Sequence, residues 1–154
     1  MGTGPQDEQE LVADLVVQRL GAWGVGRIFG YSGDGINPLM GALRRAGGPE
    51  FVQARHEENA AFMAVGHAKY TGQPGVMLST QGPGAVHLLN GLYDAKMDSV
   101  PVVAIIGQQS RSVLGSAYMQ EIDLLNLTRD VASSFRQQVN SPEQLPLVLD
   151  RAFK

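Results

Sequence analysis

The stretch FVQARHEENAAF, residues 51–62, decides how this chain folds. Its first four residues are largely apolar and favour a β-strand, whereas the small residues that follow Asn59 favour a helix. Between them lies the charged turn RHEE, residues 55–58. This order places a carboxylate at the end of a strand and on the first turn of a helix, where the helix dipole stabilises negative charge.

Glu57, in that turn, is the candidate catalytic residue. The residues behind it are mostly apolar, and apolar surroundings raise the proton affinity of a carboxyl group. The helix dipole acts in the opposite direction. A carboxyl group held between these influences suits proton transfer better than a solvated one. On the residues alone, a glutamate that only stabilises the helix N-terminus is an equally good interpretation, and Glu58 is expected to be a solvated or interface charge.

The rest of the chain alternates between helical and strand patterns. Strands alternating with helices predict right-handed βαβ units, and apolar runs without alternation predict a sheet buried on both faces. We therefore expect an α/β fold: a parallel sheet of about five or six strands with helices on both faces. Residues 131–139 are compatible with a strand or with coil. Helices are expected at residues 8–22, 37–47, 57–70, 85–97, 120–127 and 141–154, and strands at 27–31, 51–54, 75–80 and 100–106.

Four loops are expected at one edge of this sheet: residues 32–35, 55–58, 81–84 and 107–109. Ligands of parallel α/β sheets bind outside the carboxyl ends of the strands, which is the edge where these loops lie. Three of the loops contain glycine, which lets the backbone approach a ligand closely. The fourth carries the carboxylates, so the sequence predicts a binding site where the four loops meet.

Length and composition limit the possible classes of protein. The 154 residues are expected to form one domain over 7–154, preceded by a disordered leader at 1–6. The net charge of −3 gives no reason to expect nucleic acid as a partner. The chain has no cysteine, which excludes thiolate chemistry and fits a cytoplasmic protein. No apolar run approaches the roughly 20 residues of a membrane span, so membrane contact is not indicated.

Several segments together resemble a known family. RHEENAAFMA, GVMLSTQGPGAVHLLNGLYDA, SVPVVAIIGQ and YMQE follow one another as in thiamine diphosphate-dependent enzymes of the pyruvate oxidase and acetolactate synthase group. The resemblance covers residues 11–153 and is to the N-terminal, pyrimidine-binding domain only. HLLNGLYDA and SPEQLPLVL are closer to pyruvate oxidase and quinone-linked pyruvate dehydrogenase, whereas MDSVP is as close to acetolactate synthase. The middle and diphosphate-binding domains of the family are expected to be absent from this chain.

The resemblance implies a catalytic role for Glu57. In the family, a carboxyl group at this position hydrogen-bonds to the aminopyrimidine of the cofactor and favours the imino tautomer, which then acts as a base. Gly82-Pro83-Gly84 matches the turn that lies against the pyrimidine ring. His87 comes one helical turn later and is a candidate for the same wall, although a lone histidine is more often structural.

The resemblance also implies a substrate pocket. Asp34 and Gly35 belong to the first loop, which faces the substrate, and here they replace the pairs found in related enzymes, so the substrate itself is left open. Met119-Gln120 stands where the family has Phe-Gln, which keeps the amide and exchanges an aromatic wall for a thioether. Gln108 is a weaker candidate, and a polar loop residue is the alternative for it.

No metal site is expected in this chain. The three histidines do not share the sequence spacing of metal ligands, and no cysteine joins them. Gly33-Asp34-Gly35, with Asn59 some two dozen residues later, is similar in residues and spacing to the magnesium-binding motif of the family. That motif belongs to the C-terminal domain, however, and its asparagine follows a strand, whereas Asn59 is expected in a helix.

These expectations combine into a function for the parent enzyme. It should decarboxylate a 2-oxo acid such as pyruvate, as pyruvate oxidase or quinone-linked pyruvate dehydrogenase does. Mg²⁺ and FAD would come from domains absent here, and the isolated chain should be inactive. In the family the active site lies between this domain and the diphosphate-binding domain of another subunit, which implies a homo-oligomer, at least a dimer. The alternatives are an acetolactate synthase-type carboligase, a separate subunit of a split enzyme, and a non-enzymatic α/β module that binds a nucleotide or a protein.

Overall fold

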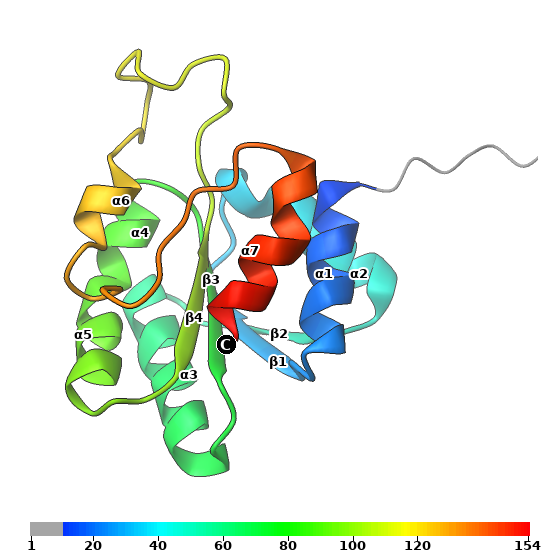
Figure 1. Ribbon diagram of the computed structural model, residues 1–154, viewed down its shortest axis with the longest axis vertical. Coiled ribbons are helices and arrows are strands. Elements are labelled where there is room, and N and C mark those ends of the chain that lie inside the picture. Colours follow the sequence, from blue (N-terminus) through cyan, green and yellow to red (C-terminus); the bar gives the residue numbers. More distant parts are fainter. Residues whose placement is uncertain (1–10) are drawn as a thin grey trace, which may run out of the picture.

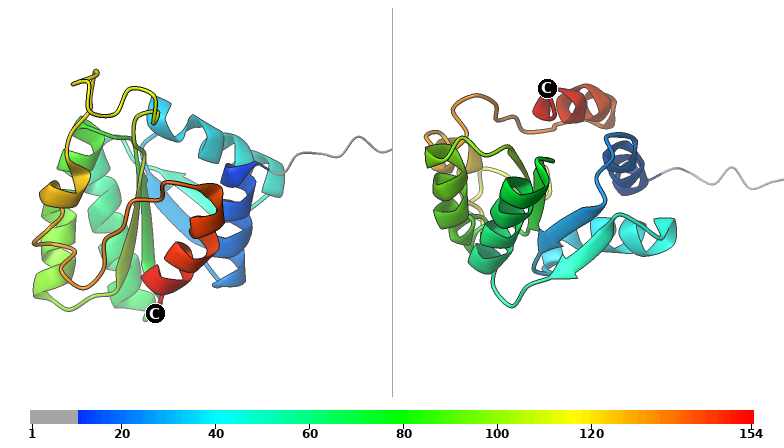
Figure 2. Two further views of the ribbon diagram at one scale, coloured as in Figure 1. Left: turned by 45° about the horizontal axis from the view of Figure 1, so that its top comes forward. Right: turned by 90° about the horizontal axis from the view of Figure 1, so that it is seen from below.

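The computed structural model describes residues 11–154, which form a parallel sheet with helices on both faces (Figures 1 and 2). The α/β class expected from the sequence is confirmed. The strands are β1 (Arg27–Gly30), β2 (Glu50–Gln53), β3 (Gly75–Ser79) and β4 (Val102–Ile106). The α-helices are α1 (Val12–Ala22), α2 (Asn37–Ala46), α3 (Glu57–Thr71), α4 (Pro83–His87), α5 (Leu89–Met97), α6 (Leu124–Leu127) and α7 (Leu145–Ala152). Two 3-10 helices, η1 (Asp34–Ile36) and η2 (Pro142–Gln144), precede α2 and α7.

The leader expected at residues 1–6 lies outside the described residues. The single helix expected over 85–97 is interrupted at Leu88, which forms a turn between α4 and α5. The short helix expected over 120–127 is confined to α6. Within residues 11–154, no helix combines the length and apolar character needed to cross a membrane.

The sheet has four strands in the order β2-β1-β3-β4, and all of them are parallel. The expectation of five or six strands was too high, because residues 131–139 form turns and coil instead of a fifth strand. Their sequence, VASSFRQQV, lacks the alternation of a half-buried strand and contains two adjacent serines. This coil passes over the free side of β4 without pairing with it (Figure 2).

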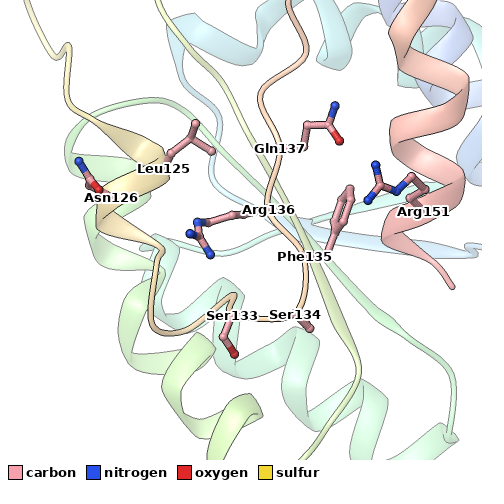
Figure 3. Close-up of a pocket in the computed structure, with 8 residues that line it drawn as sticks. All are labelled: Leu125, Asn126, Ser133, Ser134, Phe135, Arg136, Gln137 and Arg151. Carbon is pink, nitrogen blue, oxygen red and sulfur yellow. The ribbon is translucent and has the colours of Figure 1, made fainter.

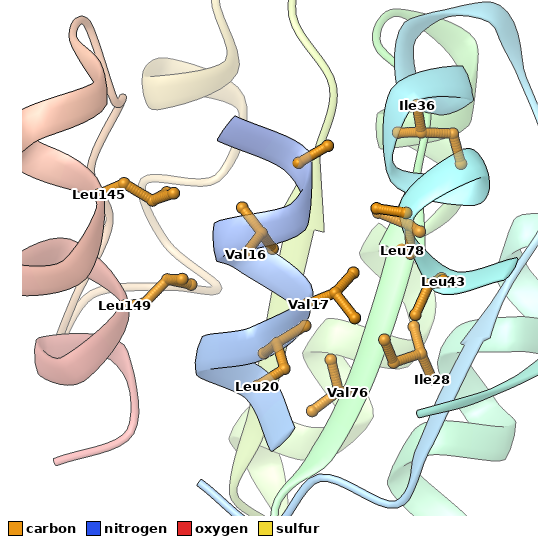
Figure 4. Close-up of a cluster of buried hydrophobic side chains, with 12 residues drawn as sticks. Val16, Val17, Leu20, Ile28, Ile36, Leu43, Val76, Leu78, Leu145 and Leu149 are labelled. Atoms are coloured by element: carbon orange, nitrogen blue, oxygen red, sulfur yellow. The ribbon is translucent and has the colours of Figure 1, made fainter. Parts of the chain in front are cut away.

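Two hydrophobic cores lie on opposite faces of the sheet, because successive strand residues point to opposite sides. Ile28, Val76 and Leu78 join the core formed with α1, α2 and α7 (Figure 4). Their neighbours Phe29 and Met77 join the second core, under α3 and α5. The central strands are therefore covered on both faces, as their continuous apolar sequence predicts.

Small residues bring α3 close to its neighbours. Ala61 and Ala64 are fully buried. A Cβ atom added to Gly91 of α5 would lie 2.4 Å from the Cβ of Ala61, and one added to Gly75 of β3 would lie 2.1 Å from the carbonyl oxygen of Ala64. The short distances from α3 to α5 and β3 thus depend on glycine. This tight packing fixes the position of the α3 N-terminus, which carries Glu57.

A polar network ties α1 to α7. The guanidinium of Arg19 donates two hydrogen bonds to the carboxylate of Asp150, one of them from Nε at 2.7 Å. The indole Nε1 of Trp23 donates a third at 2.8 Å, and the Trp23 ring stacks on Phe153. These hydrogen bonds, those from Arg19 first, lower the pKa of Asp150 from 3.8 to about 2.

Acid titration should reveal this network. Because the pKa of Asp150 is lower in the folded state, its ionisation stabilises the fold above pH 3.8, and that stabilisation disappears as the pH falls toward about 2. We expect Asp150→Asn to lower the thermal unfolding midpoint at pH 7. The difference from the unsubstituted protein should shrink as the pH is lowered through this window, as followed by circular dichroism. A difference that stays constant down to pH 2 contradicts the assignment.

Candidate active site

Glu57 is the first residue of α3 and belongs to the charged turn that follows β2. His56 caps the helix: its backbone is extended, and its Nδ1 atom accepts a hydrogen bond of 3.2 Å from the backbone N–H of Glu58. Glu57 is only 7% exposed, which is unusual for a glutamate. The local structure therefore places a buried carboxylate at a helix N-terminus, where its negative charge is favoured.

The partner of the Glu57 carboxylate is His87, from the end of α4. Oε2 of Glu57 lies 2.9 Å from Nδ1 of His87. The His87 ring also stacks on His56, with 4.3 Å between the ring centroids. When the carboxylate is ionised it is only an acceptor, so Nδ1 of His87 must carry the proton of this hydrogen bond. His87 thus holds the carboxylate in one orientation, and His56 packs against His87.

The glycine turn expected to face the cofactor adjoins this carboxylate. A Cβ atom at Gly84 would lie 3.2 Å from Oε1 of Glu57 and 2.6 Å from Oγ of Ser79. Gly82 has a positive φ of 62°, and a Cβ atom there would lie 2.7 Å from the carbonyl oxygen of Gln120. Pro83, between the two glycines, is exposed. The turn therefore passes close to Glu57 on one side and to residue 120 on the other.

The residues expected around the substrate are only partly brought together. Gly35 packs against the side chain of Gln81, and the amide of Gln120 reaches the same side chain. Asp34 is exposed at the start of η1, and Met119 is 67% exposed. The amide oxygen of Gln108 accepts the backbone N–H of Gln109 at 2.8 Å, so this side chain is engaged with its own loop.

Two functional candidates were missed by sequence reasoning. Gln81 is 4% exposed and lies among the substrate-facing loops, although the sequence shows only a polar residue before a glycine turn. His56 is the stacking partner of His87, a contact between residues far apart in the chain that no local pattern could reveal. The position of Gln81 at the carboxyl end of a buried strand was the available signal for the first of them.

The cluster of Glu57 with the two histidines is relevant to the prediction that the chain has no metal site. His56, Glu57 and His87 offer ligand atoms within 4.8 Å of one another. Sequence spacing alone does not show this, because the fold brings the histidines together. The Nδ1 atoms of both already have protein partners, Glu58 N–H and Glu57. The absence of a metal from this site stays a prediction.

Two surface cavities lie away from these residues. One, of about 420 Å³, is lined by Leu125, Asn126, Ser133, Ser134, Phe135, Arg136, Gln137 and Arg151 (Figure 3). The other, of about 410 Å³, is bordered by Trp23, Arg27, Glu50, His67 and Phe153, among others. Neither of these two cavities is lined by Glu57, the glycine turn or Gln120. The candidate active site lies outside both of them, and because Asp34, Pro83 and Met119 are exposed there, it forms an open edge of the sheet.

Residues 11–127 match the family described as "Thiamine pyrophosphate enzyme, N-terminal TPP binding domain". The chain belongs to this thiamine pyrophosphate enzyme family. It is 49% identical over 140 residues to a protein of Bacillus subtilis (strain 168) provisionally named thiamine pyrophosphate-containing protein YdaP. It is 45% identical over 141 residues to the acetolactate synthase isozyme 2 large subunit of Escherichia coli (strain K12), and 37% identical over 147 residues to the chloroplastic acetolactate synthase of Arabidopsis thaliana.

These alignments cover 90%, 92% and 96% of this thiamine pyrophosphate enzyme domain, but only 24%, 25% and 22% of the three relatives. The chain thus spans about a quarter of the length of the curated relatives that it matches. The family resemblance inferred from the sequence motifs is confirmed, as is its restriction to the N-terminal domain. Among the relatives, the acetolactate synthase names favour the carboligase alternative over the pyruvate oxidase interpretation.

Proposed function

We propose that this domain belongs to an enzyme that decarboxylates a 2-oxo acid and condenses the two-carbon unit with a second 2-oxo acid, as the name acetolactate synthase implies for its relatives. The observation that carries this proposal is the Glu57 carboxylate, which is buried at a helix N-terminus beside a glycine turn. We propose a carboligase in place of a pyruvate oxidase-type enzyme because relatives of this chain are named acetolactate synthase. The split subunit and the non-enzymatic module lack a comparable supporting observation.

The residues present fit the pyrimidine end of thiamine diphosphate. The cofactor, when bound, supplies the carbon nucleophile that attacks the oxo group of the substrate. Glu57 would hold a proton at a ring nitrogen, which requires a carboxyl group in a water-poor place. Gly82 and Gly84 have no side chains, which lets the turn lie close to Gln120 and to Glu57, and the ring would lie against the backbone of this turn. His87 would orient Glu57 through the 2.9 Å contact with Oε2, which leaves Oε1 for the ring.

The proposal includes a second subunit. The candidate site is an open edge, and its missing wall would be the diphosphate-binding domain of another copy, which would also contribute Mg²⁺ and, where it is present, FAD. Exposed apolar side chains on the nearby helices support such an assembly, because large exposed apolar patches commonly mark interfaces. Phe62 of α3 and Val86 of α4 lie within two helical turns of Glu57 and of the glycine turn, and they are 43% and 44% exposed.

Product analysis of the complete enzyme tests this function. With pyruvate, thiamine diphosphate and Mg²⁺, we expect CO₂ release together with acetolactate, and no dependence of the rate on an added electron acceptor. Acetate formation coupled to reduction of the acceptor would instead support the oxidative alternative. No CO₂ release from pyruvate or its longer 2-oxo homologues would reject the enzymatic proposal altogether.

A further inference from the structure

A relay of three hydrogen bonds joins the loops at the open edge of the sheet. The backbone N–H of Gly35 donates to Oγ1 of Thr80 at 3.1 Å, and this hydroxyl donates to Oε1 of Gln81 at 2.8 Å. Nε2 of Gln81 then donates to Oε1 of Gln120 at 3.4 Å. The relay runs from the first loop, through the residues before the glycine turn, to the 119–120 segment, so it links both segments expected to face the substrate.

The relay begins at a group that can only donate. A backbone N–H can only donate, so Thr80 accepts from Gly35 and has its own proton available for Gln81. The oxygen of the Gln81 amide accepts that proton, and the Gln81 nitrogen faces Gln120. Gln120 in turn accepts with its oxygen, and its NH₂ group is left free for another partner. With Gln81 in this orientation, an exchange of oxygen and nitrogen in Gln120 would place the two NH₂ groups, both donors, against each other.

The Gln81 side chain also lies in a tight space. A Cβ atom added to Gly35 would lie 1.6 Å from Oε1 of Gln81, and one added to Gly107 would lie 3.3 Å from the same oxygen. The amide thus fills the space that these two glycines leave. Within residues 11–154, every buried side-chain nitrogen and oxygen has a hydrogen-bond partner, which includes this amide. Gln120 itself is exposed and has a positive φ of 63°, so its amide is accessible from the open edge.

We propose that Gln81 is a positioning residue that orients the Gln120 amide so that its NH₂ group faces the carboxylate of the 2-oxo acid. The inference rests on the proposed function and adds the determinant by which the free acid is preferred over uncharged analogues. A carboxylate is an acceptor only, so it requires this orientation of the amide. Gln81 acts through Gln120 and need not touch the substrate.

Kinetics of Gln81→Met in the complete enzyme test this role, because methionine keeps the length of the side chain and removes both hydrogen bonds. We expect KM for the 2-oxo acid to rise about tenfold or more, the usual scale for a lost hydrogen bond to a charged group. Turnover at saturation, cofactor affinity and unfolding temperature should stay near those of the unsubstituted enzyme. The inhibition constant of pyruvate analogues should rise, whereas that of the corresponding methyl esters should not, so the preference for the free acid shrinks.

Two controls make the result specific. Gln73→Met makes the same exchange at an exposed glutamine in the turn after α3 and should change none of these quantities. In a Gln120→Ala background, Gln81→Met should raise KM no further, because coupled residues are not additive. An unchanged KM and ester discrimination in Gln81→Met overturns the inference, and so does a joint loss of cofactor affinity and thermal stability. A parent enzyme inactive on every 2-oxo acid rejects the proposed function together with this inference.

Discussion

Glu57→Gln should lower the rate of 2-oxo acid decarboxylation by about 100- to 10,000-fold, the range typical for loss of a positioned proton-transfer group. Glutamine has the same shape and can still accept a hydrogen bond from Nδ1 of His87, so the fold around α3 should be retained. It cannot take up or release a proton, however. The measurement is single-turnover CO₂ release by the complete enzyme, with circular dichroism to check the fold.

Glu58→Gln is the matched control. Glu58 is the next residue on the same turn of α3, carries the same charge and is partly exposed, but only its backbone N–H takes part in the local network. Turnover of this variant should stay within about threefold of the unsubstituted enzyme, as expected for a surface charge. Near-normal turnover in Glu57→Gln, or equal losses in the two variants, would overturn the catalytic assignment.

Gly84→Ala should weaken thiamine diphosphate binding by about tenfold or more, since overpacking a tight site typically costs ~1–3 kcal/mol. The added methyl group would lie 2.6 Å from Oγ of Ser79, 2.9 Å from Cγ2 of Thr80 and 3.2 Å from Oε1 of Glu57. Ser79 and Thr80 are buried and cannot move away easily, so the turn or the carboxylate must shift. Titration of the complete apoenzyme with cofactor, followed by calorimetry, measures the change.

Gly21→Ala separates this steric effect from the general effect of adding a methyl group to a helix. Gly21 lies in the last turn of α1, is exposed, and has no atom within 4 Å of the position of an added Cβ. That substitution should leave cofactor affinity unchanged and stabilise the helix by a few tenths of a kcal/mol, up to ~1 kcal/mol. Equal cofactor affinity in both variants would show that cofactor binding does not depend on the positions of the glycine turn and the Glu57 carboxylate.

Much of the fold could be predicted from local sequence because its elements carry strong local signals. The β2–α3 junction is an example: an apolar run, a charged turn and an alanine-rich helix occur within twelve residues, and the structure places Glu57 at the first position of α3. Residues 131–139 carry no such signal. Their assignment depends on whether β4 accepts another strand, which is a property of the tertiary structure, and here it does not.

The candidate site also has some features that the sequence predicts and others that depend on the tertiary structure. The topology of a parallel sheet was enough to predict that the loops around Gly35, Glu57 and Gly82 share one edge. The pairing of Glu57 with His87 and the relay through Gln81 depend on side-chain positions in elements that are far apart in the sequence. Such contacts have no local sequence pattern.

The coil over the outer side of β4 has a consequence for self-association. Uncovered edge strands recruit strands from other molecules and promote aggregation, and proteins commonly prevent this by shielding the edge with a loop. Val102–Ile106 is an uncharged, aliphatic strand that would promote aggregation if it were uncovered. Because residues 131–139 cross it, continuation of the sheet into a neighbouring molecule is disfavoured at β4, and β2 is left as the sheet edge where a further strand could add.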